Sequence, residues 1–390
     1  MKKYFVLILA ILISAIFTLN IFAYSGTKSM AVSTSRNDIN YTVNAKSAVL
    51  MEAQTGEILY AFNEEARYSP ASVTKVMTLL IVMESLRDGK ITIDENITVS
   101  DYAASMGGSQ VFLEEGEVMS VKDLIKSTAI ASANDAAVAL AEHIAGSEKL
   151  FVSKMNKRAS ELGLKNTSFE NVTGLDDTTV DHMTCARDIA IMSRELIKHE
   201  LIKEYSTKWQ DTIRNGEFTL TNTNRLVRYY DGCTGLKTGS TDKAGYCLSA
   251  TAKRGGMELI AVIMGAETRD IRNKEAKALL DFGFANYALY SDEECELPRI
   301  PVISGEKSYA TLYAAPFTSV INKECIGNVQ KTLEIPEELS APVAENAVFG
   351  KIIYTLDNEV IGYSNVYAKE SINKASVGKL FSLIINDIFS

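Results

Sequence analysis

Hydrophobic positions in the first three quarters of the chain recur mainly at helical spacing. An apolar run over 73–86 follows Pro70 and predicts a buried helix that starts close to Ser72. Two further helical patterns cover 121–130 and 135–143, with a short polar connection between them. We therefore expect helices to form much of the first core.

A strand pattern follows these helices. Residues 235–239 and 244–248 flank the polar turn 240–243, and this arrangement predicts a β-hairpin. Gly239 lies at the end of the first strand, where the lack of a side chain would let a ligand backbone lie close to the strand edge.

A change of composition near residues 290–297 marks a domain boundary. Five of the six prolines lie beyond it, among short strand patterns such as 308–313. Residues 351–355 and 360–364 flank a turn and predict a second hairpin. We expect a small β-rich domain over 291–370, without a catalytic cluster of its own.

Both ends of the chain carry apolar patterns. Two lysines precede an apolar run over 4–17, and Ala23 follows, which is typical of a secretory signal peptide over 1–23. An uncleaved anchor is the alternative, because the run is slightly long. Residues 24–44 are expected to be a flexible segment.

Residues 371–390 predict an amphipathic helix, too short to span a membrane, that lies in the membrane interface or packs on its own domain. Its apolar positions are Val377, Leu380, Phe381, Ile384, Ile388 and Phe389.

Composition narrows the classes of function. With 390 residues and 46% apolar content, the chain can build more than one domain with an ample core. Loss of Lys2 and Lys3 with the leader changes the formal charge from -9 to -11, because 38 basic residues then face 49 acidic ones. Such a chain is poorly suited to bind nucleic acid. The five cysteines lack Cys-x-x-Cys spacing, and one disulfide remains possible. The chain has only three histidines, so a metal-dependent hydrolase is disfavoured. We expect neither a metal nor a cofactor.

Three short motifs follow one another in a fixed order: Ser72-x-x-Lys75, Ser132-x-Asn134 and Lys237-Thr238-Gly239. Each motif alone is weak. The first matches readily by chance, the second can be read as a pair of helix caps, and the third as an ordinary strand end. In this order they are the set that marks penicillin-binding proteins and serine β-lactamases.

The first motif combines a nucleophile with a base. Residues three apart share one face of a helix, so the Ser72 hydroxyl and the Lys75 ammonium can meet. A position at a helix N-terminus also directs free N–H groups at a developing oxyanion. For Lys75 to act as a base, its pKa must fall from about 10.4 toward about 7, which costs on the order of 4 to 5 kcal/mol. Burial beside a second cation would lower it, and Lys237 is the obvious candidate.

The other two motifs supply proton transfer and substrate contacts. The Ser132 hydroxyl can relay a proton to a leaving group, and the Asn134 amide can both donate to and accept from a substrate peptide bond. Lys237 and Thr238 offer a charge and a hydroxyl to a substrate carboxylate. The motifs together predict acyl transfer through a covalent serine intermediate.

Further segments widen the match, and the chain resembles the low-molecular-weight D-alanyl-D-alanine carboxypeptidases, penicillin-binding enzymes that trim the stem peptides of peptidoglycan. The resemblance covers roughly residues 45–287. Its landmarks include Pro70-Ala71-Ser72, Gly108-Ser109, Asn166-Thr167, Gly174-Leu175, Ala186-Arg187-Asp188 and Ala244-Gly245-Tyr246-Cys247.

The resemblance implies a fold, a substrate and further site residues. It implies a penicillin-binding/β-lactamase-like α/β (α+β) catalytic domain over 45–290, with an antiparallel sheet flanked by helices. The β-rich domain would be a stalk, and the terminal helix would bind the membrane surface. Arg272 matches the family arginine that helps to hold the terminal carboxylate, and the N–H of Ser240, often a histidine in relatives, would serve the oxyanion hole. The expected ligands are a peptidoglycan pentapeptide and β-lactam inhibitors, and the expected location is the outer face of the cytoplasmic membrane or the cell wall.

Two alternatives remain at this stage. A class A-like β-lactamase needs a deacylating glutamate in a Glu-x-x-x-Asn context; Glu170 lies in a plausible interval, but position 174 is glycine. A non-catalytic wall-binding scaffold would be expected to lose the nucleophile or the base, whereas Ser72 and Lys75 are both present. The carboxypeptidase is the favoured interpretation.

Overall fold

The computed structural model describes residues 41–376 and residue 378. They fold as two compact units, residues 41–290 with 320–327, and residues 291–319 with 328–376.

The first unit is built on a five-stranded antiparallel sheet with the order β2-β1-β9-β8-β7. Its strands are β1 (Ser47–Glu52), β2 (Ile58–Phe62), β7 (Cys233–Thr241), β8 (Gly245–Arg254) and β9 (Met257–Ala266). The predicted hairpin is confirmed as β7–β8, with a shorter turn than expected because β7 continues to Thr241. The third motif therefore lies on an edge strand.

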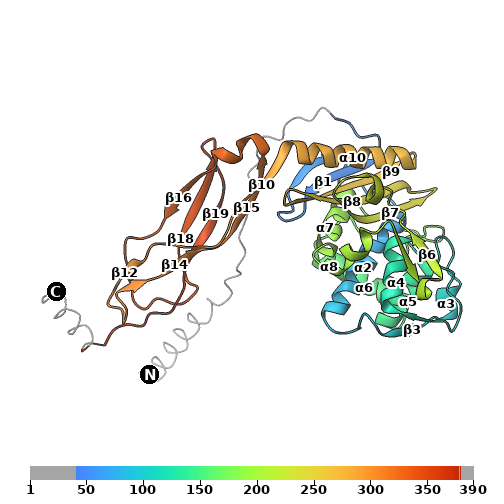
Figure 1. Ribbon diagram of the computed structural model, residues 1–390, viewed down its shortest axis with the longest axis horizontal. Helices are drawn as coiled ribbons and strands as arrows, with labels where there is room; N and C mark the ends of the chain where they lie inside the picture. Colours follow the sequence, from blue (N-terminus) through green and yellow to red (C-terminus); the bar gives the residue numbers. More distant parts are fainter. Residues whose placement is uncertain (1–40, 377, 379–390) are drawn as a thin grey trace, which may run out of the picture. The chain divides into compact units, whose positions relative to one another are not determined.

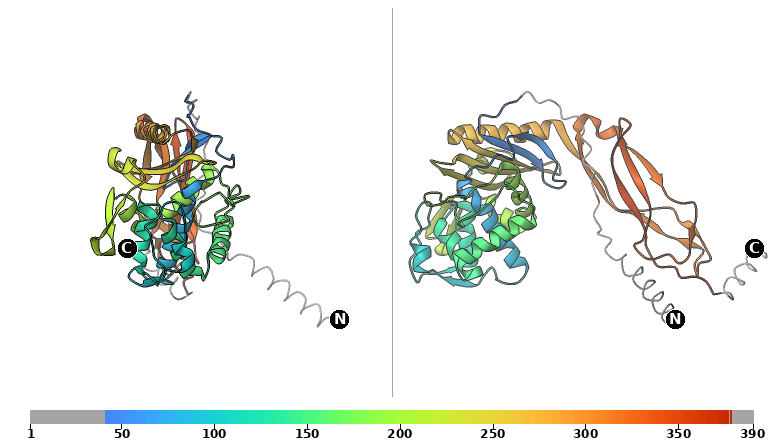
Figure 2. Two further views of the ribbon diagram at one scale, coloured as in Figure 1. Left: turned by 90° about the vertical axis from the view of Figure 1, so that its right-hand side faces the viewer. Right: turned by 180° about the vertical axis from the view of Figure 1, so that it is seen from behind.

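Helices cover both faces of this sheet. Helix α10 lies across one face, and the helical part of the unit lies against the other (Figures 1 and 2). The helices are α2 (Lys75–Arg87), α3 (Asp101–Ala104), α4 (Val121–Ile130), α5 (Asn134–Ala145), α6 (Glu148–Glu161), α7 (Ala186–Leu196), α8 (Glu200–Ser206), α9 (Leu226–Tyr229) and α10 (Arg269–Asn286). Short 3-10 turns η1 (Ala71–Thr74) and η2 (Arg214–Gly216) and the small hairpins β3 (Asn96–Thr98) with β4 (Val118–Ser120) and β5 (Gln210–Ile213) with β6 (Phe218–Thr221) complete the unit.

Local sequence explains where several helices begin. Side chains of Ser120, Ser147 and Thr268 accept hydrogen bonds from backbone N–H groups at the starts of α4, α6 and α10. Helix α2 has no such cap; instead, it is buried on nearly every side, as its continuous apolar run predicts.

Two apolar cores result, one on each face of the sheet. The larger packs α2, α4, α5 and α7 against one face and contains fully buried Met77, Leu80 and Ile125. The smaller packs α10 against the other face through Leu279 and Leu280. Because α2 is central to the larger core, the residues at its N-terminal end are held rigidly.

The second unit is rich in short strands, as expected. One sheet has the order β11-β14-β19-β18-β16, another has the order β13-β12-β17, and β10 pairs with β15. The strands of this unit are β11 (Cys295–Glu296), β12 (Ile300–Ile303), β13 (Tyr309–Ala310), β14 (Leu312–Ala314), β16 (Gln330–Glu334), β17 (Leu339–Ser340), β18 (Val348–Leu356) and β19 (Glu359–Ala368). Strands β10 (Tyr287–Asp292) and β15 (Phe317–Asn322) run across the boundary between the two units, and all but the last residue of the 3-10 turn η3 (Lys323–Asn328) belongs to the first. The second predicted hairpin is β18–β19, and its turn residues Asp357 and Asn358 both have positive φ, 49° and 66°.

The predicted start of the terminal helix at residue 371 is wrong. Ile372 forms an antiparallel bridge with Val343, and Lys374 forms one with Gly305. Burial of Ile372 in the β unit explains why this stretch stays extended. The apolar positions assigned to the helix from residue 377 onward, like the predicted signal peptide and most of the segment 24–44, lie outside the described residues.

Three further features bear on the expectations from composition. All five cysteines are described and all are free. Among the described residues, no helix is long and apolar enough to cross a membrane. Within that same part of the chain, no cluster of three or more histidine, cysteine or acidic side chains could hold a metal ion.

Candidate active site

Ser72 lies in a tight turn in front of α2, not in the helix itself. The sequence predicted a helix starting close to Ser72, but residues 71–74 form η1 and α2 begins at Lys75. Ala71 has a φ of 48°, which is incompatible with a regular helical start. The Ser72 hydroxyl nevertheless lies 3.0 Å from Lys75 Nζ, as the three-residue spacing required.

Two glycines allow other segments to approach this turn. A Cβ on Gly239 of β7 would lie 2.8 Å from both the Pro70 oxygen and the Ser72 nitrogen. One on Gly174 would lie 1.9 Å from the Ala71 oxygen. Gly239 was expected to make room for a ligand backbone; in the structure it makes room for the backbone of the nucleophile turn itself.

Lys75 is fully buried and makes three hydrogen bonds. Its Nζ donates to Ser72 Oγ at 3.0 Å, to Asn134 Oδ1 at 2.6 Å and to the Thr173 carbonyl at 2.8 Å. Burial, and then the charge of Lys237, lower the pKa of Lys75 well below its ordinary value, while Asp135 acts in the opposite direction. The pKa of Lys75 is therefore shifted in the direction that a general base requires, and Lys237 is the second cation that the sequence suggested.

Ser132 and Lys237 form the second half of the site. Ser132 follows α4 with a φ of 64°, and its hydroxyl accepts a hydrogen bond from Lys237 Nζ at 2.8 Å. Lys237 also donates to the carbonyl of Thr238 at 2.8 Å. Burial together with the charge of Arg272 lowers the pKa of Lys237 to about 7. A group with this pKa can both donate and accept a proton near neutral pH, as a relay through Ser132 requires.

Asn134 is the first residue of α5 and does not cap it, in contrast to the reading of the second motif as a pair of helix caps. The N-cap is Ala133, without a side-chain hydrogen bond. The Asn134 amide is occupied elsewhere: Oδ1 accepts from Lys75, and Nδ2 donates to the Gly107 carbonyl at 2.7 Å. Its own backbone N–H donates to the Ser109 carbonyl at 2.7 Å.

The edge strand β7 contributes Thr238 and Ser240 beside Gly239. The Thr238 hydroxyl donates to the Thr223 hydroxyl at 2.7 Å. Ser240 is exposed and pairs with Tyr246 across the hairpin. Thr223 is a neighbour that the sequence motifs did not indicate.

Arg272 lies near the third motif, and its hydrogen bonds go to Asn273 and to the Cys247 carbonyl. It is buried near the start of α10 and donates to the Asn273 side chain at 3.0 and 3.1 Å and to the Cys247 carbonyl at 3.4 Å. Cys247 is the cross-strand partner of Gly239, which brings the guanidinium near the third motif. Burial lowers the pKa of Arg272 to about 10, which leaves it charged at neutral pH.

A histidine supports the nucleophile turn without belonging to any motif. His182 is buried, and its Nδ1 accepts a hydrogen bond from the Glu170 N–H at 3.0 Å. Its Nε2 therefore carries the proton, and it donates to Thr74 Oγ1 at 2.7 Å. Burial lowers the pKa of His182 to about 4, so the ring is neutral at physiological pH. Neither spacing nor composition could have linked His182 to Thr74, which lies more than 100 positions away in the chain.

The arrangement as a whole defines a serine acyl-transferase or hydrolase site. A serine hydroxyl touches a buried lysine, a second serine touches a second buried lysine, and an edge strand runs beside both. This is a class of protein that forms and resolves a covalent ester.

Comparison with known families identifies the family within that class. Residues 30–268 match the family model of the D-alanyl-D-alanine carboxypeptidases of peptidase family S11, and residues 284–374 match the penicillin-binding protein 5 C-terminal domain. The chain belongs to the D-alanyl-D-alanine carboxypeptidase family. The predicted catalytic fold, the β-rich second domain and the serine carboxypeptidase activity are thereby confirmed.

Individual relatives extend along most of the chain. D-alanyl-D-alanine carboxypeptidase DacF of Bacillus subtilis is 45% identical over 339 residues, which cover 85% of this chain and 86% of DacF. DacA of Haemophilus influenzae is 35% identical and covers 91% of this chain and 93% of its own. Among solved structures, penicillin-binding protein 5 from Haemophilus influenzae has a TM-score of 0.77 at 34% identity, covering 86% of this chain and 99% of that one. These matches do not favour a β-lactamase or a non-catalytic scaffold.

Proposed function

We propose that this site removes the terminal D-alanine from peptidoglycan stem peptides by a two-step acyl transfer. Ser72 Oγ attacks the carbonyl of the penultimate D-alanine while Lys75 accepts the hydroxyl proton. The N–H groups of Ser72 and Ser240 stabilise the oxyanion. The observation that carries this proposal is the fully buried Lys75, 3.0 Å from Ser72 Oγ, with its pKa lowered by burial and by Lys237.

Collapse of the tetrahedral intermediate breaks the C–N bond of the terminal residue. Ser132 passes a proton to the departing amine and is reprotonated from Lys237, which donates to it at 2.8 Å. The proton that Lys75 took from Ser72 then passes to Lys237, which leaves Lys75 free to act as base again. Water attacks the ester on Ser72 and gives its proton to Lys75. That proton returns to Ser72 Oγ as the ester breaks, which releases the shortened peptide and the free serine. Each turnover consumes one water molecule and releases one D-alanine.

Substrate contacts follow from the charges around β7. We assign the C-terminal carboxylate of the substrate to Thr238, Lys237 and Arg272, because two cations and a hydroxyl gather there. Asn134 and Gly239 complete the binding residues, Asn134 through the second N–H of its Nδ2, since only one donates to Gly107, and Gly239 by keeping β7 against the Ser72 turn. β-Lactams should acylate Ser72 in the same way; a related structure, penicillin-binding protein D2 from Listeria monocytogenes in its ampicillin-bound form, is 32% identical with a TM-score of 0.56.

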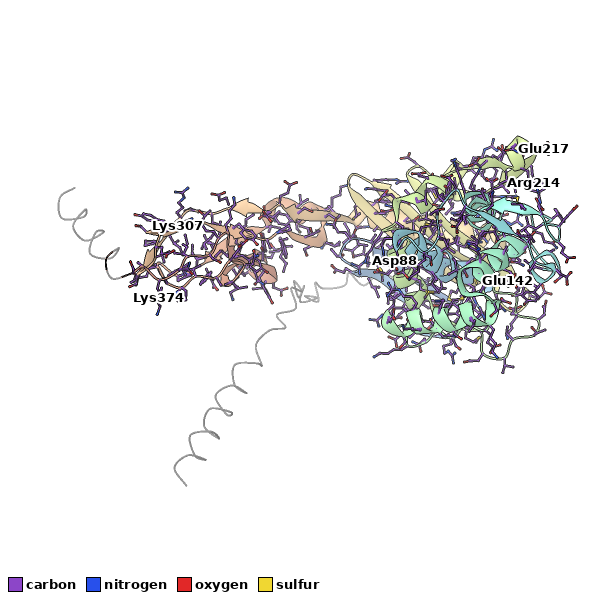
Figure 3. All side chains as sticks on the ribbon, turned by 90° about the horizontal axis from the view of Figure 1, so that it is seen from below. Asp88, Glu142, Arg214, Glu217, Lys307 and Lys374 are labelled. Carbon is purple, nitrogen blue, oxygen red and sulfur yellow. The ribbon has the colours of Figure 1, made fainter. Side chains whose placement is uncertain are left out.

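The location proposed for the enzyme is the outer face of the cytoplasmic membrane or the cell wall. Residues 1–23 would be the export signal, 45–290 the catalytic domain and 291–370 a stalk. Lys307 and Lys374 lie at one end of the second unit (Figure 3), and Lys374 comes three positions before residue 377 in the sequence, where the proposed amphipathic helix starts. Lys307 is paired with Glu370, so the proposed electrostatic contact with anionic lipid headgroups rests on Lys374.

Purified signal-free protein tests the proposed reaction. It should release D-alanine from diacetyl-Lys-D-Ala-D-Ala and bind fluorescent penicillin covalently, whereas Ser72→Ala should do neither. Ser153→Ala, a change of an exposed serine on α6, is the matched control and should behave like the parent. A penicillin adduct mapped by mass spectrometry to a serine other than Ser72 would overturn the assignment.

A further inference from the structure

The β5–β6 hairpin carries an arginine that takes no part in the chemistry described above. Arg214 lies at the tip of this hairpin (Figure 3). Its Nε and Nη2 donate to the two carboxylate oxygens of Glu117 at 2.7 and 3.0 Å. Nη1 and Nη2 also donate to the carbonyls of Val111 and Phe112 at 2.9 and 3.1 Å. All three guanidinium nitrogens therefore hold one loop, residues 105–117, in a planar fork that lysine cannot reproduce.

The same loop contacts the active site at its other end. The carbonyl of Ser109 accepts from the backbone N–H of Asn134, and the carbonyl of Gly107 accepts from Asn134 Nδ2, both at 2.7 Å. A Cβ on Gly108 would lie 2.8 Å from that same Nδ2, so the loop backbone is packed directly on the amide. The loop is thus fixed between α5 and the β5–β6 hairpin.

The backbone is strained on both sides of the arginine contact. Phe112 has a φ of 57°, and Arg214 and Asn215 have φ values of 51° and 54°. Residues with a side chain rarely adopt this left-handed region, and such strain persists only where the surroundings enforce it. Here the hairpin tip directs Arg214 at the loop, and the loop turns its carbonyls toward Arg214.

We propose that Arg214 is a positioning residue for acylation. A carbonyl oxygen can only accept, so Gly107 holds the Asn134 amide with Nδ2 toward the loop and Oδ1 toward Lys75. Lys75 donates to that Oδ1 at 2.6 Å, and this contact helps to keep its Nζ beside Ser72. Arg214 holds the 105–117 loop in place, and the loop in turn holds the orientation of the Asn134 amide. The amide then keeps Lys75 Nζ beside Ser72. This inference rests on the proposed roles of Ser72 and Lys75.

The test compares two arginines of similar exposure. The Arg214 side chain is 23% exposed, and the Arg158 side chain is 25% exposed. Arg158 pairs with Glu161 on its own helix α6 and with Glu84 in the last turn of α2, at the opposite end of that helix from Lys75. Acylation by fluorescent penicillin is followed at increasing concentration, to separate the limiting rate constant from the apparent affinity. Arg214→Ala should lower the limiting rate constant roughly 10-fold to 100-fold with little change in affinity, as expected when a base is displaced. Arg158→Ala should lower the melting temperature but leave both kinetic constants unchanged.

Several outcomes would overturn the proposal. An unchanged limiting rate constant in Arg214→Ala would do so, as would a loss confined to the affinity or an equal loss in Arg158→Ala. If Arg214→Ala does not fold, Glu117→Gln carries the test, because it weakens the ion pair and leaves the arginine in place; its limiting rate constant should fall by a smaller factor, and an unchanged one refutes the proposal. Failure of the parent protein to be acylated would count against the proposed function instead.

Discussion

The neutral, buried His182 makes the catalytic unit sensitive to acid in a way that can be measured. Its pKa lies at about 4 instead of 6.5, because burial disfavours the charged ring. Below pH 6.5 the unfolded chain binds a proton at this histidine that the folded chain does not accept until the pH approaches 4. The free energy of unfolding therefore falls as the pH falls through this window, by about 3 kcal/mol in total and by about 2 kcal/mol between pH 7 and pH 5.

The variant His182→Gln removes this titration and keeps the hydrogen-bonding pattern. A glutamine amide can donate to Thr74 Oγ1 and accept from the Glu170 N–H, as the neutral imidazole does. Between pH 7 and pH 5, the free energy of unfolding of the variant should fall by about 2 kcal/mol less than that of the parent, whatever its value at pH 7. Carboxylates that titrate in both proteins contribute equally to the dependence of the unfolding free energy on pH, so their contribution cancels when the two slopes are compared.

Urea unfolding followed by tryptophan fluorescence measures this difference. Trp209 is the only tryptophan of the chain, and it lies in the first unit, so the signal reports that unit alone. Ser153→Ala, a change of an exposed residue that does not titrate, is the control and should keep the parent slope. Equal pH slopes in the parent and His182→Gln would refute the burial argument.

Three further outcomes are expected. Lys75→Arg keeps a cation but cannot readily release its proton, so the rate of penicillin acylation should fall about 100-fold to 10,000-fold; a near-normal rate would rule out the base role. Arg272→Ala, or amidation of the substrate carboxylate, should slow D-alanine release about 10-fold to 150-fold, since charge-assisted contacts contribute on this scale; equal rates on the free acid and the amide would contradict the assignment. Deleting residues 377–390 should release the signal-cleaved protein from vesicles of anionic lipid and leave peptidase activity intact; continued binding to those vesicles would exclude the proposed anchor.

The catalytic motifs and both hairpins could be predicted from the sequence, because each depends on short spacings. Ser72 and Lys75 are three residues apart, and the strand around Lys237 has its own turn signal. The distant partners could not be predicted. Thr173, Thr223 and His182 touch the site residues through backbone oxygens, a hydroxyl and a buried ring that carry no pattern along the chain.

Helix boundaries were the weaker part of the prediction for a related reason. The apolar run over 73–86 was correctly assigned to a buried helix, but its start was displaced by the left-handed Ala71. That conformation is imposed by segments that pack on the turn from elsewhere in the fold, and a periodicity of apolar residues contains no information about them. The same applies to residues 371–376, which pair with loop segments of the β unit and so do not begin a helix.

The two glycines that press on the nucleophile turn also limit how this enzyme could evolve resistance to β-lactams. One conceivable route to resistance is an added side chain beside Ser72 that hinders the drug while the normal substrate still fits. At Gly239 and Gly174 that route is closed, because any added Cβ meets the backbone of residues 70–73 before it could meet a drug. A substitution there would displace Ser72 for inhibitor and substrate alike. Resistant variants should therefore arise at positions of the active site whose side chains already face solvent, such as Ser240.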